Sequence, residues 1–596
     1  MNKDLIYKKT FTRRALVLGS CKALLVAGLL SRMFYLQVIN NKKFEILSDR
    51  NRIKTLILPS LRGKIIDRNN AQLALNEQKY QLIFEKLETH NKDLLYKIAL
   101  KIGQILSLTP EIQASLINDL KNLRLNDEVM IEENLNWQQL LEFEFNAHEL
   151  TGFNIVTGFN RIYPFNELCG HLTGYIGTIS NKDKPTITYH PDSKVGKNGI
   201  EKTQEKLLHG TSGIKTIEVN AKSEYIKEIS NIPSINGQDV QLSIDIELQK
   251  KAAALLDNNT GVILVSKIDT GEILCSVSNP SFNPNLFNNG ISANNWNNLL
   301  NNPELPLIDR SVALTYPPGS GFKVNVAIAA LKNNLNPLTI FHCPGHYTLG
   351  NRKFRCWNKA GHGQINLYQA IAGSCNVYFW NVARIIGIQS FADMARIMGY
   401  DQKLLNNSLP REQNGIIPDP EWKSKAIGSS WTISDTLNAA IGQGYVEATP
   451  IQILTMVSRI ASGKQVIPTI FKKEQANVDF ASLNMEKELQ IVKKGMEMAT
   501  GDSFLGTAYR NRILIKELAM AGKTGTSQVI SKRHADDDLS RINVMKKIRN
   551  HGIFVSYAPI HQPKYAFCGI IEHGGTPALA VKIAKELLTE AQLKNI

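Results

Sequence analysis

The sequence lacks the features that would mark a disordered, fibrous or nucleic-acid-binding protein. Charged residues make up only 20% of the chain and hydrophobic residues 43%, an ordinary balance that excludes a disordered chain. The formal net charge is +16, but lysine and arginine are scattered and form no basic stripe, so nucleic acid is not an expected partner. With 596 residues the chain is too long for one hydrophobic core, and at least two domains are expected.

One segment near the N-terminus is long and apolar enough to cross a membrane. Residues 15–38 are mostly apolar, and Lys22 and Arg32 lie close enough to the ends to reach the headgroups. Residues 1–14 are rich in lysine and arginine, which predicts a cytoplasmic tail. We therefore expect a single-pass anchor, with the chain beyond residue 40 in an oxidising compartment.

Three other interpretations of this segment remain open: a cleaved signal peptide, a lipoprotein signal ending at Cys21, and a buried amphipathic helix. Only a handful of apolar residues separate Arg14 from Cys21, fewer than the roughly 7 to 15 of a signal core. No convincing small-x-small cleavage site follows Leu30. Length and flanking charges therefore favour the anchor.

Beyond the anchor, the hydrophobic patterns predict two regions. Residues 39–235 are expected to form an extended mixed α/β domain without any constellation suited to catalysis, and residues 236–596 an α+β domain. In the first region we expect strands and a hairpin over 52–75 and helices over 93–106, 137–147 and 199–208, with a short helix from Thr109-Pro110. In the second we expect strands at 240–244, 261–266, 271–277, 553–557 and 565–571 and helices at 246–256 and 580–593. The asparagine-rich stretch 294–302 is expected to be a solvated loop.

The strongest chemical signal is the run Y-P-P-G-S-G-F-K from Tyr316 to Lys323, followed by an apolar helix. The Pro-Pro-Gly turn places Ser320 at the helix N-terminus, where unpaired backbone N–H groups favour developing negative charge. Lys323 lies one turn further on the same face, and burial would lower its pKa so that it accepts the serine proton as general base. A lone Ser-x-x-Lys match usually marks only an exposed serine and a surface lysine.

A second and a third motif follow in the same domain, and their order makes the combination specific. The second is Ser374-Cys375-Asn376, after a helical run. Ser374 is expected to relay the proton toward the leaving amine, and Asn376 to hold Lys323 and the substrate amide.

The third motif, A-G-K-T-G-T-S at 521–527, is predicted to be a strand. A strand with glycine at position 525 lets an extended peptide approach and pair by backbone hydrogen bonds. Lys523, Thr524 and Thr526 offer cationic and hydroxyl partners for a substrate carboxylate, with Gly525 between them. The backbone N–H groups of Ser320 and Thr526 would form an oxyanion hole. As plain strand residues, Thr524 and Thr526 would need no function.

These three motifs, in this order and behind an anchor, resemble the class B penicillin-binding proteins. The likeness spans the chain, since Arg62-Gly63 with 67–69 is similar to an early family motif and 442–445 with Thr449-Pro450 to the approach to the third motif. Pro317-Pro318-Gly319, and Cys356-Trp357 followed by 361–363, resemble the elongation-type group, penicillin-binding protein 2. Asn376 departs from the Asp frequent in that group, and Gly321 from a more usual Thr.

The resemblance implies a pedestal of the dimerisation type over 39–235 and, over 236–596, a serine transpeptidase domain of the penicillin-binding or β-lactamase-like fold, a central antiparallel sheet with helices. It implies D,D-transpeptidation during elongation: a stem peptide ending in D-Ala-D-Ala acylates Ser320, and a neighbouring strand supplies the acceptor amine. β-Lactams would acylate the same serine. A SEDS-type (RodA-like) glycosyltransferase and other elongation-complex proteins would be partners, with the catalytic domain on the periplasmic side of the inner membrane.

Three other functions remain open. The acyl-enzyme could be hydrolysed, as in a D,D-carboxypeptidase or a β-lactamase, although a compact lactamase would not need the region before residue 235. The transpeptidase could act in septation, where Asn at position 376 is more typical. A scaffold or antibiotic sensor would use the same motifs without turnover.

Three of the seven cysteines and one histidine lie close in sequence, as Cys343, Cys356, His362 and Cys375. Three thiolates and an imidazole are a common structural zinc set, and some elongation-type relatives bind zinc here with Asp for some cysteines. Cys343 is the ligand whose spacing is shifted from that arrangement, and His342 and His346 are possible substitutes. A Cys343–Cys356 disulfide or buried free thiols are the alternatives. Cys169, Cys275 and Cys568 are expected to be core residues.

Overall fold

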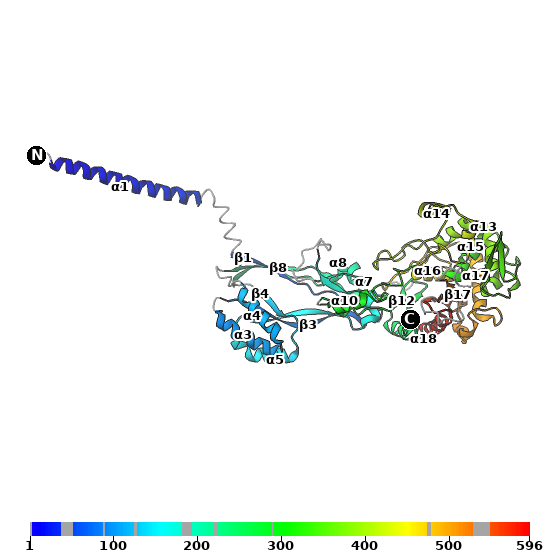
Figure 1. Ribbon diagram of the computed structural model, residues 1–596. Helices are drawn as coiled ribbons and strands as arrows, with labels where there is room; N and C mark the ends of the chain where they lie inside the picture. The colour runs from blue at the N-terminus through cyan, green and yellow to red at the C-terminus, as the bar shows by residue number, and fades with distance from the viewer. Residues whose placement is uncertain are drawn as a thin grey trace.

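The structure is a computed structural model that describes residues 3–36, 52–87, 90–123, 128–180, 194–219, 225–288, 290–473, 478–528 and 549–596. From residue 52 onward the molecule is elongated (Figure 1). The pedestal, coloured blue to cyan, forms one end, and the C-terminal part of the chain, coloured green to red, forms the other.

Helix α1, Lys3–Phe34, contains residues 15–34 of the predicted anchor 15–38. Its stretch Ala15–Phe34 has a mean hydropathy of 1.6 and no buried residue, so its length and composition suit a membrane span. Residues 37 and 38 of the predicted span lie outside the described residues.

The pedestal contains two larger sheets and a cluster of helices. The three-stranded sheet has the order β1 (Ile53–Leu58), β8 (Gly213–Val219), β9 (Tyr225–Ile232). The five-stranded sheet runs β10 (Val240–Gln241), β2 (Ile65–Ile66), β3 (Gln72–Glu85), β4 (Glu128–Glu132), and β5 (Phe153–Ile162) also pairs with β3. The helices are α3 (Lys92–Ile105), α4 (Pro110–Asn122) and α5 (Trp137–Asn146), which agree with prediction.

The predicted helix over 199–208 is instead two short helices, α7 (Gly199–Thr203) and α8 (Glu205–His209). The break falls at Gln204, whose backbone leaves the helical region at φ −107° and ψ 22°. The remaining elements of this region are η2 (Ala147–Glu149), η3 (Asn166–Cys169), α6 (Gly170–Thr173) and the paired strands β6 (Ile176–Thr178) and β7 (Lys194–Gly196).

A five-stranded antiparallel sheet organises the second region. Its order is β12 (Ile273–Asn279), β11 (Gly261–Lys267), β19 (Tyr565–Ile571), β18 (His551–Ala558), β17 (Ala521–Ser527). Successive side chains point to opposite faces, so Val262 and Leu264 belong to one buried cluster and Ile263 and Val265 to another. This confirms the predicted antiparallel sheet and leaves β17 at its edge.

Helices cover both faces of this sheet. One cluster joins α9 (Ile246–Leu256) and α18 (Ala578–Lys594) to the first face. The other cluster joins α11 (Lys323–Lys332), α13 (Asn376–Ile397), α16 (Pro450–Ser462) and α17 (Glu486–Gly501) to the second face.

The remaining helices of this region are short: η4 (Pro284–Phe287), α10 (Ala293–Leu300), η5 (Gly319–Phe322), α12 (Leu367–Ala372), α14 (Pro420–Ile427), α15 (Ile433–Ala440), η6 (Tyr509–Asn511) and η7 (Lys516–Leu518). Two further pairs of strands are β13 (Phe341–Cys343) with β16 (Gly363–Ile365) and β14 (His346–Leu349) with β15 (Arg352–Arg355).

Two further predictions differ from the structure. The asparagine-rich stretch was predicted as a loop, which is wrong, because α10 occupies most of it. The Ser292 hydroxyl caps its N-terminus by accepting from the Asn295 N–H, and Trp296 and Leu300 recur at helical spacing. The strand predicted at 240–244 ends at Gln241, and it pairs with β2 of the pedestal sheet.

The domain boundary predicted at residue 235 stays a prediction. The largest buried cluster contains residues from both sides of that position, so the hydrophobic core does not divide there.

Candidate active site and metal centre

Ser320 lies in a tight turn at the start of α11. The turn is the 3-10 helix η5, and the α-helix itself begins only at Lys323. Gly319 has φ +54°, and a Cβ at this position would lie 2.6 Å from the carbonyl oxygen of Thr526. Glycine therefore lets the nucleophile turn pack against the end of β17.

Lys323 is fully buried beside the second motif. Its Nζ donates to the Ser374 carbonyl oxygen at 2.8 Å, to Ser374 Oγ at 3.3 Å and to Asn376 Oδ1 at 2.6 Å. Burial lowers the pKa of Lys323 from 10.5 to about 8. All three acceptors are uncharged, so a neutral amine, the form that can act as a base, becomes accessible near physiological pH.

Ser374 connects the two lysines of the site. Its Oγ accepts from Lys523 Nζ at 2.8 Å in addition to Lys323. Its backbone has φ +55°, an uncommon conformation for a residue other than glycine. Burial, and then the nearby Lys323, lower the pKa of Lys523 well below its ordinary value. Hydrogen bonds therefore connect Lys323, Ser374 and Lys523, and the proton relay through Ser374 stays a prediction.

The third motif lies on the edge strand β17, which pairs with β18 on one side only within the described chain. Lys523 and Thr524 are buried and Thr526 is half-buried. A Cβ at Gly525 would lie 3.1 Å from the Pro318 carbonyl oxygen, so the strand runs close to the nucleophile turn. An extended peptide has a free strand edge to pair with beside Ser320.

Two further residues of the site were given no role from the sequence. Thr507 accepts a hydrogen bond from the Thr524 hydroxyl at 2.7 Å. Trp357 donates its indole N–H to the carbonyl oxygens of Gly373 and Ser374, each at 3.1 Å. Trp357 was noted only for its family likeness, and Thr507 lies in no motif.

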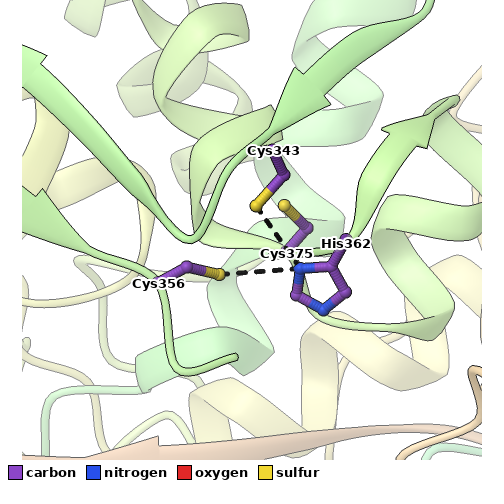
Figure 2. A group of neighbouring side chains, drawn as sticks. All are labelled: Cys343, Cys356, His362 and Cys375. Carbon is purple, nitrogen blue, oxygen red and sulfur yellow. Dashed lines mark hydrogen bonds between the residues drawn. The ribbon is translucent and has the colours of Figure 1, made fainter. Parts of the chain in front are cut away.

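The predicted metal ligands come together in one cluster (Figure 2). The ligand atoms of Cys343, Cys356, His362 and Cys375 all lie within 4.8 Å of one another. His362 Nδ1 is 3.5 Å from Cys343 Sγ and 3.7 Å from Cys356 Sγ. Hydrogen bonds from Cys375, and then from His362, lower the pKa of Cys343 and of Cys356. Cys375 is also the N-cap of α13, which begins with Asn376.

The seven cysteines are all free thiols, so the alternative of a Cys343–Cys356 disulfide is not realised. His342 and His346, considered as substitute ligands, are not members of the cluster that the described residues form. Cys169, Cys275 and Cys568 are buried, which confirms them as core residues.

Two family models match the chain. The penicillin binding protein transpeptidase domain matches residues 261–590, and the penicillin-binding protein dimerisation domain matches residues 57–242. The first match covers the three motifs described above, and the second covers most of the pedestal.

Relatives match along nearly the whole chain. The peptidoglycan D,D-transpeptidase MrdA of Acinetobacter baumannii is 34% identical over 94% of this chain and 84% of the relative. MrdA of Escherichia coli is 29% identical over 98% of this chain and 94% of the relative. Penicillin-binding protein 2 (PBP2) of Helicobacter pylori, solved in complex with MreC, matches with a TM-score of 0.81 and 32% identity over 91% of this chain and 99% of the solved chain. This chain therefore belongs to the class B penicillin-binding proteins, in the PBP2 or MrdA group.

Proposed function

We propose that this chain is a peptidoglycan D,D-transpeptidase that forms peptide cross-links during cell elongation. The observation that carries the proposal is the convergence of Lys323, Ser374 and Lys523, linked by hydrogen bonds of 2.8 to 3.3 Å, beside the turn that holds Ser320. Three sequence-distant motifs thus supply a nucleophile, a base and a relay in one place. The MrdA relatives carry the same activity in their names.

The reaction takes place in two acyl transfers. Neutral Lys323 accepts the Ser320 proton while Oγ attacks the carbonyl carbon of the penultimate D-Ala. The backbone N–H groups of Ser320 and Thr526 stabilise the oxyanion. The C–N bond then breaks, and Ser374 passes a proton to the departing D-Ala amine. In the second transfer an acceptor amine attacks the ester carbon, loses its proton to the same relay and restores Ser320.

The substrate lies along β17 in this proposal. Its backbone pairs with the free edge of the strand, and its terminal carboxylate binds the hydroxyls of Thr524 and Thr526 near Lys523. Gly525 keeps this approach open because it has no side chain. Asn376 holds the substrate amide and Lys323. A β-lactam would enter the same position and stay attached to Ser320.

Covalent labelling with fluorescent penicillin tests the nucleophile. The wild-type chain should be labelled, and Ser320→Ala should not; Ser429→Ala, which changes an exposed serine outside the motifs, should be labelled like wild type. Persistent labelling of Ser320→Ala would overturn the assignment. Adding an acceptor amine to a D-Ala-D-Ala peptide should then divert product from hydrolysis to transfer, which separates a transpeptidase from a D,D-carboxypeptidase or a lactamase.

We also propose that Cys343, Cys356, His362 and Cys375 hold a structural zinc ion. Four N and S ligand atoms within 4.8 Å suit a tetrahedral ion with Zn–S distances of about 2.3 Å. Such an ion would tie β13, which carries Cys343, and Cys356, which directly follows β15, to the start of α13. It would so brace Ser374 and Asn376.

Metal content tests this second proposal independently of turnover. Purified wild type should contain about one zinc ion per chain, as expected for a closed four-ligand site. Cys356→Ser should lose the zinc and lower the unfolding temperature. Cys568→Ser, which changes a buried free thiol outside the cluster, should keep it. Zinc-free wild type with an unchanged unfolding temperature would refute the site.

The membrane setting gives two further proposals. The lysines and arginines of residues 1–14 favour a cytoplasmic N-terminus, and α1 then places the catalytic domain in the periplasm. A SEDS-type, RodA-like glycosyltransferase is the expected polymerase partner, and an MreC-type protein a second one, because the H. pylori relative was solved with MreC. A reporter that is active only in the periplasm, fused after residue 596, should report activity; silence there, with activity of an N-terminal fusion, would reverse the orientation.

A further inference from the structure

Glu572 joins two buried side chains behind the nucleophile turn. It directly follows β19, and its Oε1 accepts hydrogen bonds from the Tyr316 hydroxyl at 2.6 Å and from Arg310 Nε at 2.9 Å. Tyr316 is 4% exposed and Arg310 is 1% exposed. Because Tyr316 shortly precedes Ser320 in the chain, the carboxylate connects the end of β19 to the segment that leads to the nucleophile.

The segment between Tyr316 and Ser320 is stiff. Residues 317 and 318 are both proline, so their φ angles are fixed. Gly319 donates its backbone N–H to the Gly442 carbonyl oxygen at 2.9 Å. A displacement of Tyr316 is therefore passed on to Ser320 instead of being absorbed between them.

The residue after Glu572 reaches the strand on the other side of the nucleophile turn. His573 donates its backbone N–H to His551 Nδ1 at 3.0 Å. His551 begins β18 and pairs in register with Ser527, which follows Thr526 at the end of β17. Burial, and then the nearby His573, lower the pKa of His551 to about 4, so its ring is neutral near pH 7 and Nδ1 can accept.

We propose that Glu572 and His573 form a clamp that positions the two backbone N–H groups of the oxyanion hole. The proposal rests on the proposed function, in which Ser320 and Thr526 supply those groups. Glu572 holds the nucleophile turn, and His573 holds the end of β17. Both act through another side chain, so they are positioning residues. An oxyanion hole needs donors about 2.7–3.1 Å from the oxygen, and a small shift of either side weakens it.

Tyr316→Phe tests the first half of the clamp, since it keeps the ring and removes the hydroxyl that donates to Glu572. The full chain in detergent reacts with penicillin, and the concentration dependence separates initial binding from the first-order acylation step. Acylation should slow about tenfold with unchanged initial binding, because the oxyanion forms only during the attack. The backbone of Tyr316 still pairs with Ala448, so the loss should stay below the roughly 10²- to 10³-fold of a deleted oxyanion donor.

Tyr565→Phe is the matched control. Tyr565 is 1% exposed, lies at the opposite end of β19 from Glu572, and donates one hydrogen bond, to the Ile596 carbonyl oxygen at 3.0 Å. This variant should be acylated like wild type. A loss of folded protein would lower the amount of labelled chain in either variant, but it would not change the first-order rate of the chains that react.

Two substitutions at His551 test the second half. His551→Leu removes the acceptor of the His573 N–H and should slow acylation about tenfold, whereas His551→Asn, whose Oδ1 can replace Nδ1, should keep most of the rate. A peptide boronic acid gives a further readout, because its boron bonds to Ser320 Oγ and directs a hydroxyl oxygen into the oxyanion hole. Its Kd should rise about tenfold in Tyr316→Phe and in His551→Leu, in step with the acylation rates.

Acylation of Tyr316→Phe at the wild-type rate would overturn the clamp, and so would weaker initial binding with an unchanged acylation step. If Tyr316→Phe fails to fold, the two His551 variants decide alone, and equal acylation rates in them would overturn the clamp. Failure of the proposed function gives a different result, because wild type itself would then not be labelled by penicillin. A labelled wild type with an unchanged Tyr316→Phe rate refutes only the clamp.

Discussion

The pedestal and the transpeptidase domain each bury a pair of cationic side chains, Arg62 and Arg161 in the first and Lys323 and Lys523 in the second. In the pedestal, Glu201 receives both arginines, with Arg62 Nε at 2.6 Å and Arg161 Nε at 2.8 Å. In the active site the lysines meet only neutral oxygens of Ser374, Asn376 and Thr524.

The pKa values follow this difference. Burial alone would raise the pKa of Glu201, but attraction to Arg62 and Arg161 outweighs it and lowers the pKa. At Lys323 burial dominates, and only the neighbouring Cys356, Cys375 and Cys343 partly offset it, so its pKa falls to about 8. In the pedestal, the carboxylate of Glu201 therefore keeps the arginines and itself charged, and the charged cluster has a structural role. In the active site no carboxylate lies beside the lysines, so they can lose a proton.

Removing Lys323 should have the largest effect. Lys323→Ala should slow acylation by penicillin about 10²- to 10⁴-fold, the usual contribution of a general base. Its unfolding temperature should fall much less than that of the pedestal variant below, because no carboxylate is left buried with its charge unpaired. Stopped-flow acylation and thermal unfolding measure the two quantities. Lys332→Ala, at the exposed end of the same helix, is the control, and acylation of Lys323→Ala within tenfold of wild type would contradict the role of base.

Breaking the pedestal pair should have the opposite pattern. Glu201→Gln leaves two buried arginines without their carboxylate and should lower the free energy of unfolding by about 3–5 kcal/mol. The acylation rate of the folded fraction should stay unchanged. Denaturant unfolding measures the first effect. Glu228→Gln removes an exposed pair with Lys215 and should leave the free energy of unfolding almost unchanged; an equal loss in the two variants would mean that burial does not matter.

The active site can be made to resemble the pedestal by placing a carboxylate beside Lys323. In wild type the acylation rate should rise with pH through about 8, because the neutral amine is the base. Asn376 Oδ1 lies 2.6 Å from Lys323 Nζ, so Asn376→Asp should raise the pKa of Lys323 and move the midpoint upward. If the midpoint moves up by about one pH unit, acylation at neutral pH should slow about tenfold, because the neutral amine becomes that much rarer. A midpoint that stays in place or moves down would show that this amine does not set the pH profile.

The comparison also shows which parts of the site could be predicted from sequence. Ser320 and Lys323 share one turn, so the Pro-Pro-Gly lead and the apolar helix after it were sufficient to predict their placement. The order of the three motifs predicted that Ser374 and Lys523 join them. Arg62 and Glu201 are 139 residues apart, and nothing local in either segment predicts that they meet.

Other features depend on tertiary contacts or on a competing local signal. The indole of Trp357 reaches Ser374 only because β15 and the loop after it fold over the start of α13. The loop predicted for residues 294–302 was wrong because it rested on the asparagine-rich composition alone. The Ser292 cap and the spacing of Trp296 and Leu300 indicate a helix there. Capping and periodicity are local physics and were available in the sequence.

Thr507 provides the smallest and most selective test, because it is uncharged and lies behind the substrate strand. The Thr524 hydroxyl has one proton and donates it to Thr507 at 2.7 Å, so a substrate carboxylate must compete with Thr507 for it; Thr507→Val removes this competing acceptor. Removal of a competing hydrogen bond of about 1 kcal/mol should strengthen the initial binding of penicillin about fivefold, while the first-order acylation step, which depends on Lys323, stays constant. The concentration dependence of the acylation rate separates the two, and Thr348→Val, on the exposed face of β14, should change neither. A slower chemical step with unchanged binding would place Thr507 in the lysine relay and extend the neutral oxygen shell of the active site by one more residue.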